Sequence, residues 1–267
     1  MTDPIPGDAG SALHPARLFS CAGQVAIVTG GSSGIGRAAA EALAAAGARV
    51  LIVGLADSRP DAVARRLRGL GLKAEGLTAD LTAPDAASGL VAAAVERWGR
   101  LDTVVANAGA ALDEPGSTSV VSLDQMFALH VRSVVELANS AMPVIAGTGG
   151  GAFLVMSSLA GLRGNRALSG YGITKAANAQ LARNLAVQWG HAGVRANAIS
   201  PGVIETDFAR PITDDPSTAA LRRDRTPLGR FGRVEEVAGA VVWLASPAGG
   251  FVTGQNFVID GGTLIAD

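Results

Sequence analysis

Short runs of apolar, mostly β-branched residues alternate along this chain with longer stretches rich in Ala and Leu. The apolar runs are not interrupted by polar positions, which is typical of strands buried on both faces of a parallel sheet. They predict strands at 24–29, 49–53, 73–80, 102–107, 152–157, 194–200 and 255–260. The stretches between them predict helices at 34–46, 60–70, 84–98, 122–141, 172–190 and 234–245. This alternation predicts an α/β fold with one doubly wound, seven-stranded parallel sheet and helices on both faces.

Two local signals mark the start and the end of the longest predicted helix. One segment has neither a strand nor a helix pattern. Ser122 followed by Gln125 forms a capping-box signal at the start of the helix at 122–141, and Pro143 predicts its end. The stretch at about 203–232 has no strand pattern and contains three prolines and several charges. Because loops of this length in compact domains are usually functional, we expect this stretch to be a substrate lid.

The sequence predicts a single domain that follows a short N-terminal arm. Residues 1–22 carry Asp, Pro and Gly and predict a flexible N-terminal arm, whereas residues 23–267 hold every predicted strand and predict a single domain. Hydrophobic residues make up 48% of the 267 residues but aromatic residues only 4%, so aliphatic side chains must form the core. This composition is not that of a disordered chain.

Charge and cysteine content narrow the range of partners. With a formal net charge of -1 and no block of Lys or Arg, the sequence offers no basic surface for nucleic acid or an anionic membrane. The only cysteine, Cys21, excludes an internal disulfide and a multi-cysteine metal site. No run of 18 apolar residues predicts a membrane span, and residues 1–20 lack the apolar centre of a signal peptide. We therefore expect a cytoplasmic protein with no nucleic-acid or membrane partner and no metal site.

A glycine-rich segment, TGGSSGIG at 29–36, follows the first predicted strand and leads into a helix. Glycines let the backbone approach a pyrophosphate, and the helix N-terminus offers free N–H groups and the positive end of its dipole. The spacing is GxxxGxG, not the more common GxGxxG. The strand before it and the helix after it favour the phosphate-binding turn of a Rossmann-type sheet over an ordinary tight turn.

Tyr171 and Lys175 form a YxxxK pattern at the start of a predicted helix, where i,i+4 spacing puts the phenol and the ammonium on one face. Tyr171 is the only tyrosine and Lys175 is one of two lysines, so two rare residue types lie together. A phenol has a pKa near 10, and acting as a base near neutral pH needs a shift of about 2–3 units. One cation about 4 Å away supplies an energy of that size, so the pair is suited to proton transfer.

Together these segments resemble the short-chain dehydrogenase/reductase family. The segment at 29–36 is similar to the family's cofactor motif, the segment ANAG at 106–109 to its NNAG motif, and the segment at 200–206 to its PG motif. The resemblance spans about residues 24–262, with the motifs in the family's order. The cofactor-binding residues that it implies are Thr29, Gly30, Ser32, Ser33, Gly34, Ile35, Gly36, Asp80, Leu81, Asn107, Ala108, Gly109, Tyr171, Lys175, Pro201, Gly202, Val203, Ile204 and Thr206.

The same resemblance implies a catalytic set of Ser158, Tyr171 and Lys175, with Ser158 lying 13 residues before the tyrosine. In the implied reaction Tyr171 exchanges a proton with the substrate oxygen while a hydride passes to or from a nicotinamide. Ser158 binds that oxygen, and Lys175 also holds the nicotinamide ribose. Ser157 is the alternative to Ser158 if the strand register differs by one residue.

His130 stands where the family has a fourth catalytic residue, an Asn. It lies on a stripe of apolar positions with helical spacing, which predicts a buried helix face. One hypothesis is a histidine that serves only the core. We favour the other, in which His130 is catalytic and its two unlike ring nitrogens hold a proton-relay water near Lys175.

The end of the second strand leaves the choice between NAD and NADP open. An acidic residue there binds the ribose diol of NAD, and an Arg holds the 2′-phosphate of NADP. The family's acidic position falls on Gly54, and its NADP-type Arg positions fall on Ser33 and Leu55. Asp57 or Arg59 could reach the ribose if the loop bends back. The uncharged residues favour NAD without excluding NADP.

The sequence therefore predicts an oxidoreductase that transfers a hydride between a nicotinamide cofactor and a small alcohol or carbonyl substrate. One alternative is a non-catalytic dinucleotide-binding sensor or scaffold of the same fold, and another is a different reaction on the same scaffold, such as elimination or epimerisation. The resemblance also implies a homo-oligomer, a dimer or homotetramer, because the family's last strand often packs across a dimer interface.

Overall fold

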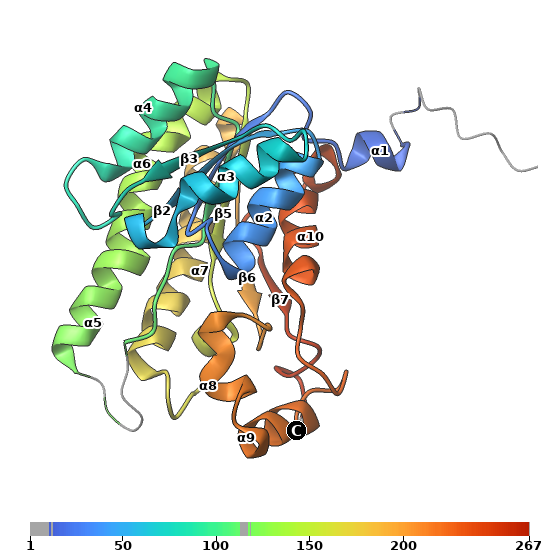
Figure 1. The fold of residues 1–267 in the computed structure, drawn as a ribbon. Coiled ribbons are helices and arrows are strands. Elements are labelled where there is room, and N and C mark those ends of the chain that lie inside the picture. Colours follow the sequence, from blue (N-terminus) through green and yellow to red (C-terminus); the bar gives the residue numbers. More distant parts are fainter. Residues whose placement is uncertain (1–10, 12, 113–116, 118, 267) are drawn as a thin grey trace, which may run out of the picture.

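The computed structural model describes residues 11, 13–112, 117 and 119–266, and it contains one sheet of seven parallel strands. The strand order is β3-β2-β1-β4-β5-β6-β7, which confirms the predicted doubly wound sheet (Figure 1). The strands are β1 (Val25–Thr29), β2 (Arg49–Gly54), β3 (Ala74–Thr78), β4 (Thr103–Ala106), β5 (Gly151–Met156), β6 (Val194–Pro201) and β7 (Asn256–Ile259).

Helices cover both faces of the sheet, as Figure 1 shows. One face packs against α2 (Gly34–Ala45), α3 (Pro60–Gly69) and α10 (Val234–Ala245). The other packs against α4 (Ala86–Trp98), α6 (Ser133–Gly147) and α7 (Ser169–Trp189). Both cores consist mainly of Ala, Val, Leu and Ile, as the composition requires. Shorter helices are α1 (Pro15–Leu18), α5 (Val120–Phe127), α8 (Arg210–Thr213) and α9 (Pro216–Asp224).

The helix predicted at 122–141 differs from the prediction at both ends. Ser119, not Ser122, caps α5, because its side chain accepts a hydrogen bond from the Ser122 N–H. A π-helical turn at Ala128–Arg132 joins α5 to α6, and α6 continues through Pro143. Met142 and Ile145, on either side of the exposed proline, are fully buried, so tertiary packing outweighs the backbone hydrogen bond that Pro143 cannot donate.

The two ends of the segment predicted as a lid, about 203–232, are held together by backbone hydrogen bonds where it leaves and rejoins the domain. The Glu205 N–H donates to the Gly232 carbonyl at 2.9 Å, and the Gly232 N–H donates to the Val203 carbonyl at 3.0 Å. Between these points lie a 3-10 turn at Asp207–Ala209 and the short helices α8 and α9, below the carboxyl ends of β6 and β7 in Figure 1. The sequence pattern missed these helices because they are short and broken by prolines.

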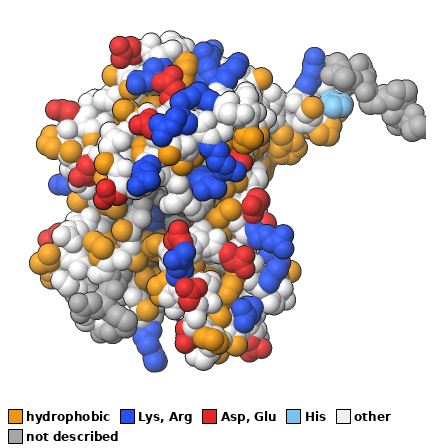
Figure 2. All heavy atoms as spheres, in the orientation of Figure 1, with side chains coloured by type: hydrophobic (Ala, Val, Ile, Leu, Met, Phe, Trp, Pro, Cys, Tyr) orange, Lys and Arg blue, Asp and Glu red, His pale blue; other side chains and the backbone are white. Residues whose placement is uncertain are grey.

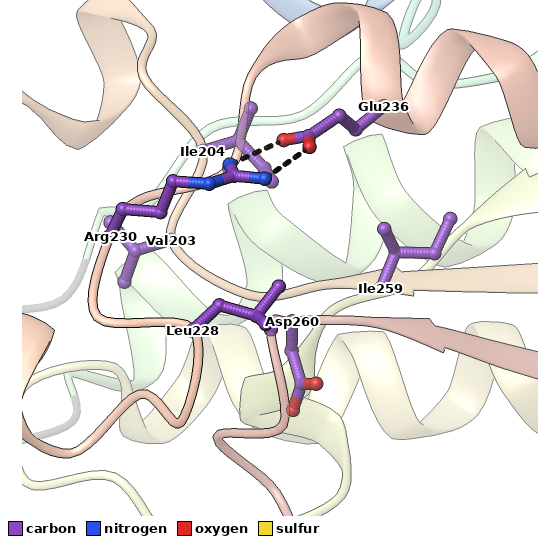
Figure 3. Close-up of a pocket in the computed structure, with 9 residues that line it drawn as sticks. Val203, Ile204, Leu228, Arg230, Glu236, Ile259 and Asp260 are labelled. Atoms are coloured by element: carbon purple, nitrogen blue, oxygen red, sulfur yellow. Dashed lines mark hydrogen bonds and ion pairs between the residues drawn. The ribbon is translucent and has the colours of Figure 1, made fainter.

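An ion pair fastens the end of this segment to α10, and Figure 3 shows Arg230 reaching to Glu236 across a small cavity. The guanidinium donates to both carboxylate oxygens, at 2.9 and 2.6 Å. The Arg233 N–H donates to the same carboxylate at 2.7 Å. The cavity has a volume of about 100 Å³ and lies beside Val203 and Ile204.

Part of the predicted N-terminal arm belongs to the folded domain. Cys21 is fully buried in the core, and its N–H donates to the Ala46 carbonyl at 2.8 Å. Residues 1–10 and 12 of the predicted arm lie outside the described residues.

The surface carries both signs of charge. Acidic and basic side chains are interspersed on the face of the molecule that Figure 2 shows. Within the described residues, no helix combines the length and the apolar character that crossing a membrane requires.

We predict that Gly151→Ala destabilises the sheet. A Cβ at this position would lie 2.0 Å from the Asp102 carbonyl oxygen on the neighbouring chain segment, so β5 would have to shift. Unfolding in urea should show a loss of about 1–3 kcal/mol. Gly89→Ala is the matched control, because open space surrounds Gly89 in α4 and the same change there should stabilise by about 0.5–1 kcal/mol. Equal unfolding free energies for the two variants would contradict this prediction.

Candidate active site

The predicted site residues come from loops at the carboxyl ends of β1, β4, β5 and β6 and from the first turns of α7. Parallel strands bring these ends to one edge of the sheet. Ligands of doubly wound sheets bind at this edge, where the strand order reverses. Here the reversal lies between β1 and β4.

The glycine-rich turn after β1 has the close backbone contacts that its sequence predicts. Gly30 and Gly34 have φ angles of +61° and +50°, in the left-handed region that favours glycine. A Cβ on Gly36 would lie 2.2 Å from the Gly30 carbonyl oxygen, so only glycine fits there. Ser33 precedes α2 without a side-chain cap, which leaves the first N–H groups of the helix free of that partner. This cradle fits a pyrophosphate.

Asn107 and Thr29 connect the glycine-rich turn to the end of β4. The Asn107 side-chain amide donates to the carbonyls of Thr29 and Gly30, at 3.1 and 3.3 Å. In return, the Thr29 hydroxyl accepts from the backbone N–H groups of Asn107 and Ala108, at 3.0 and 3.2 Å. A Cβ on Gly109 would lie 3.5 Å from Lys175 Nζ, so this loop also reaches the predicted catalytic lysine.

Two further predicted cofactor positions lie toward the β3 side of the sheet. Asp80 accepts from the N–H and the hydroxyl of Thr82, and these bonds hold the pKa of its exposed carboxyl below the usual value. Leu81 follows it and is partly buried against the core.

Gly54, at the end of β2, faces two hydroxyls instead of open space. A Cβ at Gly54 would lie 2.4 Å from Ser32 Oγ and 2.4 Å from Ser58 Oγ. The two hydroxyl oxygens are 3.1 Å apart, and the Ser58 hydroxyl also donates to the Leu55 carbonyl at 2.7 Å. This pair fills the place into which an acidic side chain at position 54 would project.

Beyond β6, the predicted PG segment runs back toward the glycine-rich turn. The Gly202 N–H donates to the Ile259 carbonyl at 2.9 Å, and a Cβ on Gly202 would lie 2.8 Å from Asp260 Cα. Thr206 then lies over the start of α2, because a Cβ on Gly34 would be 3.2 Å from its Cγ2. Gly34 and Thr206 are among the residues that line a groove of about 840 Å³ between α2, α10 and the lid segment.

The serines after β5 have different partners. The buried Ser157 hydroxyl donates to the Lys175 carbonyl at 2.7 Å and so holds α7 against the strand. Ser158 accepts from the Ala160 N–H at 3.1 Å and is hydrogen-bonded to the Tyr171 side chain. The register therefore brings Ser158, not the alternative Ser157, to the phenol.

Tyr171 and Lys175 are nearly inaccessible to solvent, with 8% and 3% of their surfaces exposed. The ammonium lies 5.4 Å from the centre of the tyrosine ring and donates to the Met156 carbonyl at 2.8 Å. Burial lowers the pKa of Lys175 to about 8. Burial raises the pKa of Tyr171 to about 12, although its hydrogen bond with Ser158 opposes this change. The phenol pKa is therefore raised, which is the opposite of the lowering that the sequence analysis expected from the lysine charge.

Both ring nitrogens of the fully buried His130 have protein partners. Nε2 accepts from the Ala110 N–H at 3.0 Å, and Nδ1 lies 2.8 Å from Thr174 Oγ1. The Thr174 hydroxyl donates to the Tyr171 carbonyl at 2.8 Å, so Nδ1 must carry the proton and donate to Thr174. Burial, followed by the Lys175 charge, lowers the pKa of His130 to about 3. A neutral ring with both nitrogens occupied has no site for the relay water that the sequence analysis expected.

The structure adds residues that sequence reasoning missed. The Phe208 ring, in the lid segment, lies 5.8 Å from the Tyr171 ring. The side-chain oxygen of Asn178, one turn beyond Lys175, is buried without a hydrogen-bond partner among the described residues. Thr174 is the one hydroxyl-bearing residue between Tyr171 and Lys175, and it could have been singled out on that ground. Only the fold shows the position of Phe208.

Comparisons with known proteins agree with this geometry. A model of the enoyl-(acyl carrier protein) reductase family matches residues 30–263. The chain is 37% identical to the cis-4-hydroxycyclohexanecarboxylate dehydrogenase of Sinomonas cyclohexanicum over 90% of its own length and 96% of that protein.

Two solved structures share the whole fold. A gluconate 5-dehydrogenase from Burkholderia cenocepacia J2315, in complex with NADP and tartrate, is 29% identical with a TM-score of 0.90, covering 95% of this chain and 100% of that chain. A 7α-hydroxysteroid dehydrogenase, complexed with NADH and 7-oxo glycochenodeoxycholic acid, is 31% identical with a TM-score of 0.89, covering 94% of this chain and 98% of that chain.

Fold, motif order and relatives agree, and the residues of the glycine-rich cradle fit a nicotinamide dinucleotide. The chain belongs to the short-chain dehydrogenase/reductase family and is an NAD(P)-dependent oxidoreductase of that family.

Proposed function

We propose that this protein interconverts a small alcohol and the corresponding ketone or aldehyde through Ser158, Tyr171 and Lys175. The observation that carries the proposal is the hydrogen bond between Ser158 and the buried Tyr171 phenol, with the Lys175 ammonium 5.4 Å from the same ring. The nicotinamide cofactor, when bound, supplies or accepts the hydride.

The side chains have separate tasks in this proposal. With a pKa near 12, the Tyr171 phenol holds its proton at neutral pH and can donate it to a carbonyl oxygen as reduction proceeds. Ser158 donates a hydrogen bond to the same oxygen. Lys175 binds the nicotinamide ribose, and its charge favours the phenolate that forms when Tyr171 gives up its proton. Burial of the pair excludes water, which strengthens this interaction.

Replacement of Tyr171 by Phe tests the proposal. The change keeps the ring and removes the ionisable oxygen, so turnover should fall by about 10²–10⁴-fold with cofactor affinity nearly unchanged. A screen of alcohols and ketones, beginning with cis-4-hydroxycyclohexanecarboxylate and gluconate and read by NADH and NADPH absorbance, finds the substrate. A variant with more than about a tenth of wild-type activity would rule out Tyr171 as the acid and base. Tight cofactor binding without turnover of any substrate would favour a sensor or scaffold.

We also propose that NAD(H) is preferred over NADP(H). The place of the ribose-binding side chain holds the Ser32 and Ser58 hydroxyls, and the exposed Leu55 offers no charge to a 2′-phosphate. Two neutral hydroxyls can hydrogen-bond a ribose diol but cannot balance a phosphate dianion.

The ratio of kcat/KM values for the two cofactors tests this preference. Without a guanidinium partner, the 2′-phosphate forgoes a contact of about 1.5–3 kcal/mol, or roughly 10–150-fold. Arg59→Ala should leave the ratio unchanged. A higher kcat/KM with NADP(H) that Arg59→Ala reverses would show that the loop after β2 does bend back to the phosphate.

We propose that His130 is a positioning residue and not a water ligand. It joins the loop after β4, through the Ala110 N–H, to α7, through Thr174 and the Tyr171 carbonyl. The cofactor-side loop and the catalytic tyrosine are therefore held in one register by a single neutral ring.

The variants His130→Leu and Thr174→Val separate this role from simple core packing. Each breaks the connection, so each should lower kcat by about tenfold or more with a smaller effect on cofactor affinity. The double variant should be little worse than the worse single one, because both remove the same connection. His130→Asn keeps an acceptor for Ala110 and should be intermediate. If the kcat of His130→Leu stays within about threefold of the wild-type value, His130 is only a core residue.

The predicted self-association is likewise proposed here. Val258 on the edge strand β7 and the nearby Phe251 are exposed, with 38% and 105% of their surfaces accessible, which supports a homo-oligomer built on this edge. The single, buried Cys21 supports a reducing compartment such as the cytoplasm.

A further inference from the structure

Three arginines gather where the loop after Ser158 meets the lid segment. Arg163 lies five residues after Ser158, and Arg222 and Arg225 lie at the end of α9. Arg222 is partly buried. Burial, followed by the charges of Arg163 and Arg225, holds its pKa below the usual value. The positive charge of Arg163 therefore acts on Arg222, although the two residues lie far apart in the sequence.

Hydrogen bonds through the C-terminal turn hold these segments together. The Arg163 guanidinium donates to the Thr263 carbonyl at 3.0 Å. The hydroxyls of Thr263 and Thr226 are 3.0 Å apart, and the Thr226 hydroxyl donates to the Arg222 carbonyl at 2.9 Å. Figure 1 shows the C-terminus beside α9. The cluster is thus a connected part of the fold.

No acidic side chain among the described residues forms an ion pair with these three arginines. The five ion pairs found in this part of the chain involve other residues. Asp260, directly after β7, instead accepts from the backbone N–H groups of Gly262 and Leu264, at 2.8 and 2.6 Å. Like charges brought together in a partly desolvated place repel one another, and a bound anion would reverse that cost.

The cluster lies on the substrate half of the site. The glycine-rich turn and Asp80 follow β1 and β3, whereas Arg163 follows β5 and the C-terminal turn follows β7, at the far end of the sheet. Ser158 begins the loop that carries Arg163. The lid segment that carries Arg222 and Arg225 also places its Phe208 ring 5.8 Å from the Tyr171 ring. An anion held by these arginines would therefore lie beside the loop after Ser158 and the lid segment, away from the glycine-rich turn that fits the cofactor pyrophosphate.

We propose that Arg163, Arg222 and Arg225 bind a carboxylate on the substrate, so that this enzyme acts on hydroxy or oxo acids whose acid group lies apart from the reacting carbon. The inference rests on the proposed function, because it assigns the substrate class of the same site. Arginine suits this task, since its planar guanidinium pairs with both oxygens of a carboxylate.

The test compares substrates that differ only in charge, in wild-type protein and two matched variants. The probes are cis-4-hydroxycyclohexanecarboxylate and its carboxamide, followed by gluconate and its amide. Wild-type kcat/KM should favour the acid by about tenfold or more. Arg222→Gln should raise KM for the acid by a similar factor, with kcat and the kinetics of the amide little changed. Arg223→Gln is the control, because it removes the same charge from the next position, where the guanidinium lies over the Phe231 ring.

Each outcome either supports or overturns the proposed carboxylate site. An acid preference lost in Arg222→Gln and kept in Arg223→Gln supports the proposal. Equal turnover of acid and amide, or equal loss in both variants, overturns it while leaving the proposed function intact. If no probe is turned over, the failure bears on the proposed function. Thermal denaturation with NAD then decides the inference separately: stabilisation by the acid but not the amide, absent in Arg222→Gln, supports it, and no difference overturns it.

Discussion

The common direction of the seven strands is the constraint on which the rest of this structure depends. Because every strand of the sheet is parallel, all carboxyl ends lie at one edge, and residues far apart in sequence meet there. The segments of Thr29, at the end of β1, and Asn107, after β4, are joined by four hydrogen bonds at the point where the strand order reverses. The predicted cradle for the cofactor and the support for the proposed catalytic residues are thus parts of one hydrogen-bonded edge.

Burial controls the chemistry at this edge. Lys175 and Tyr171 lie in a dry environment, where each tends toward its neutral form: the lysine pKa falls and the tyrosine pKa rises. The neutral His130 completes the same environment, since a charged imidazolium beside Lys175 would be strongly disfavoured. The Asn178 side-chain oxygen has no hydrogen-bond partner among the described residues, which is a cost in the same region. The nitrogen of the same amide donates to the Met156 carbonyl that also accepts from Lys175. Polar groups buried in this way lower local stability, and the proposed proton transfer gives that cost a function.

Local signals failed where long-range packing opposed them. Pro143 is a strong stop signal, yet α6 runs through it because the helix is buried on both sides of the proline. The partners of His130 come from Ala110 and Thr174, 20 and 44 residues away along the chain, so no local pattern could assign its ring nitrogens. The expected lowering of the Tyr171 pKa failed for a related reason. That expectation considered a charge one helical turn away, whereas the burial that raises the Tyr171 pKa comes from the whole fold.

The sequence by itself determined the class of fold, the glycine-rich turn and the pairing of Tyr171 with Lys175. These features are set by local periodicity and by spacing along one strand or helix, which a linear pattern records directly. Only the tertiary structure decided that Ser158 rather than Ser157 meets the phenol, that two serine hydroxyls fill the place beside Gly54, and that Phe208 packs near Tyr171. The arginines of the lid and of the loop after Ser158 also become one cluster only on folding. Such contacts depend on how separate elements approach one another, and that approach is set by the packing of the whole core, which no short stretch of sequence contains.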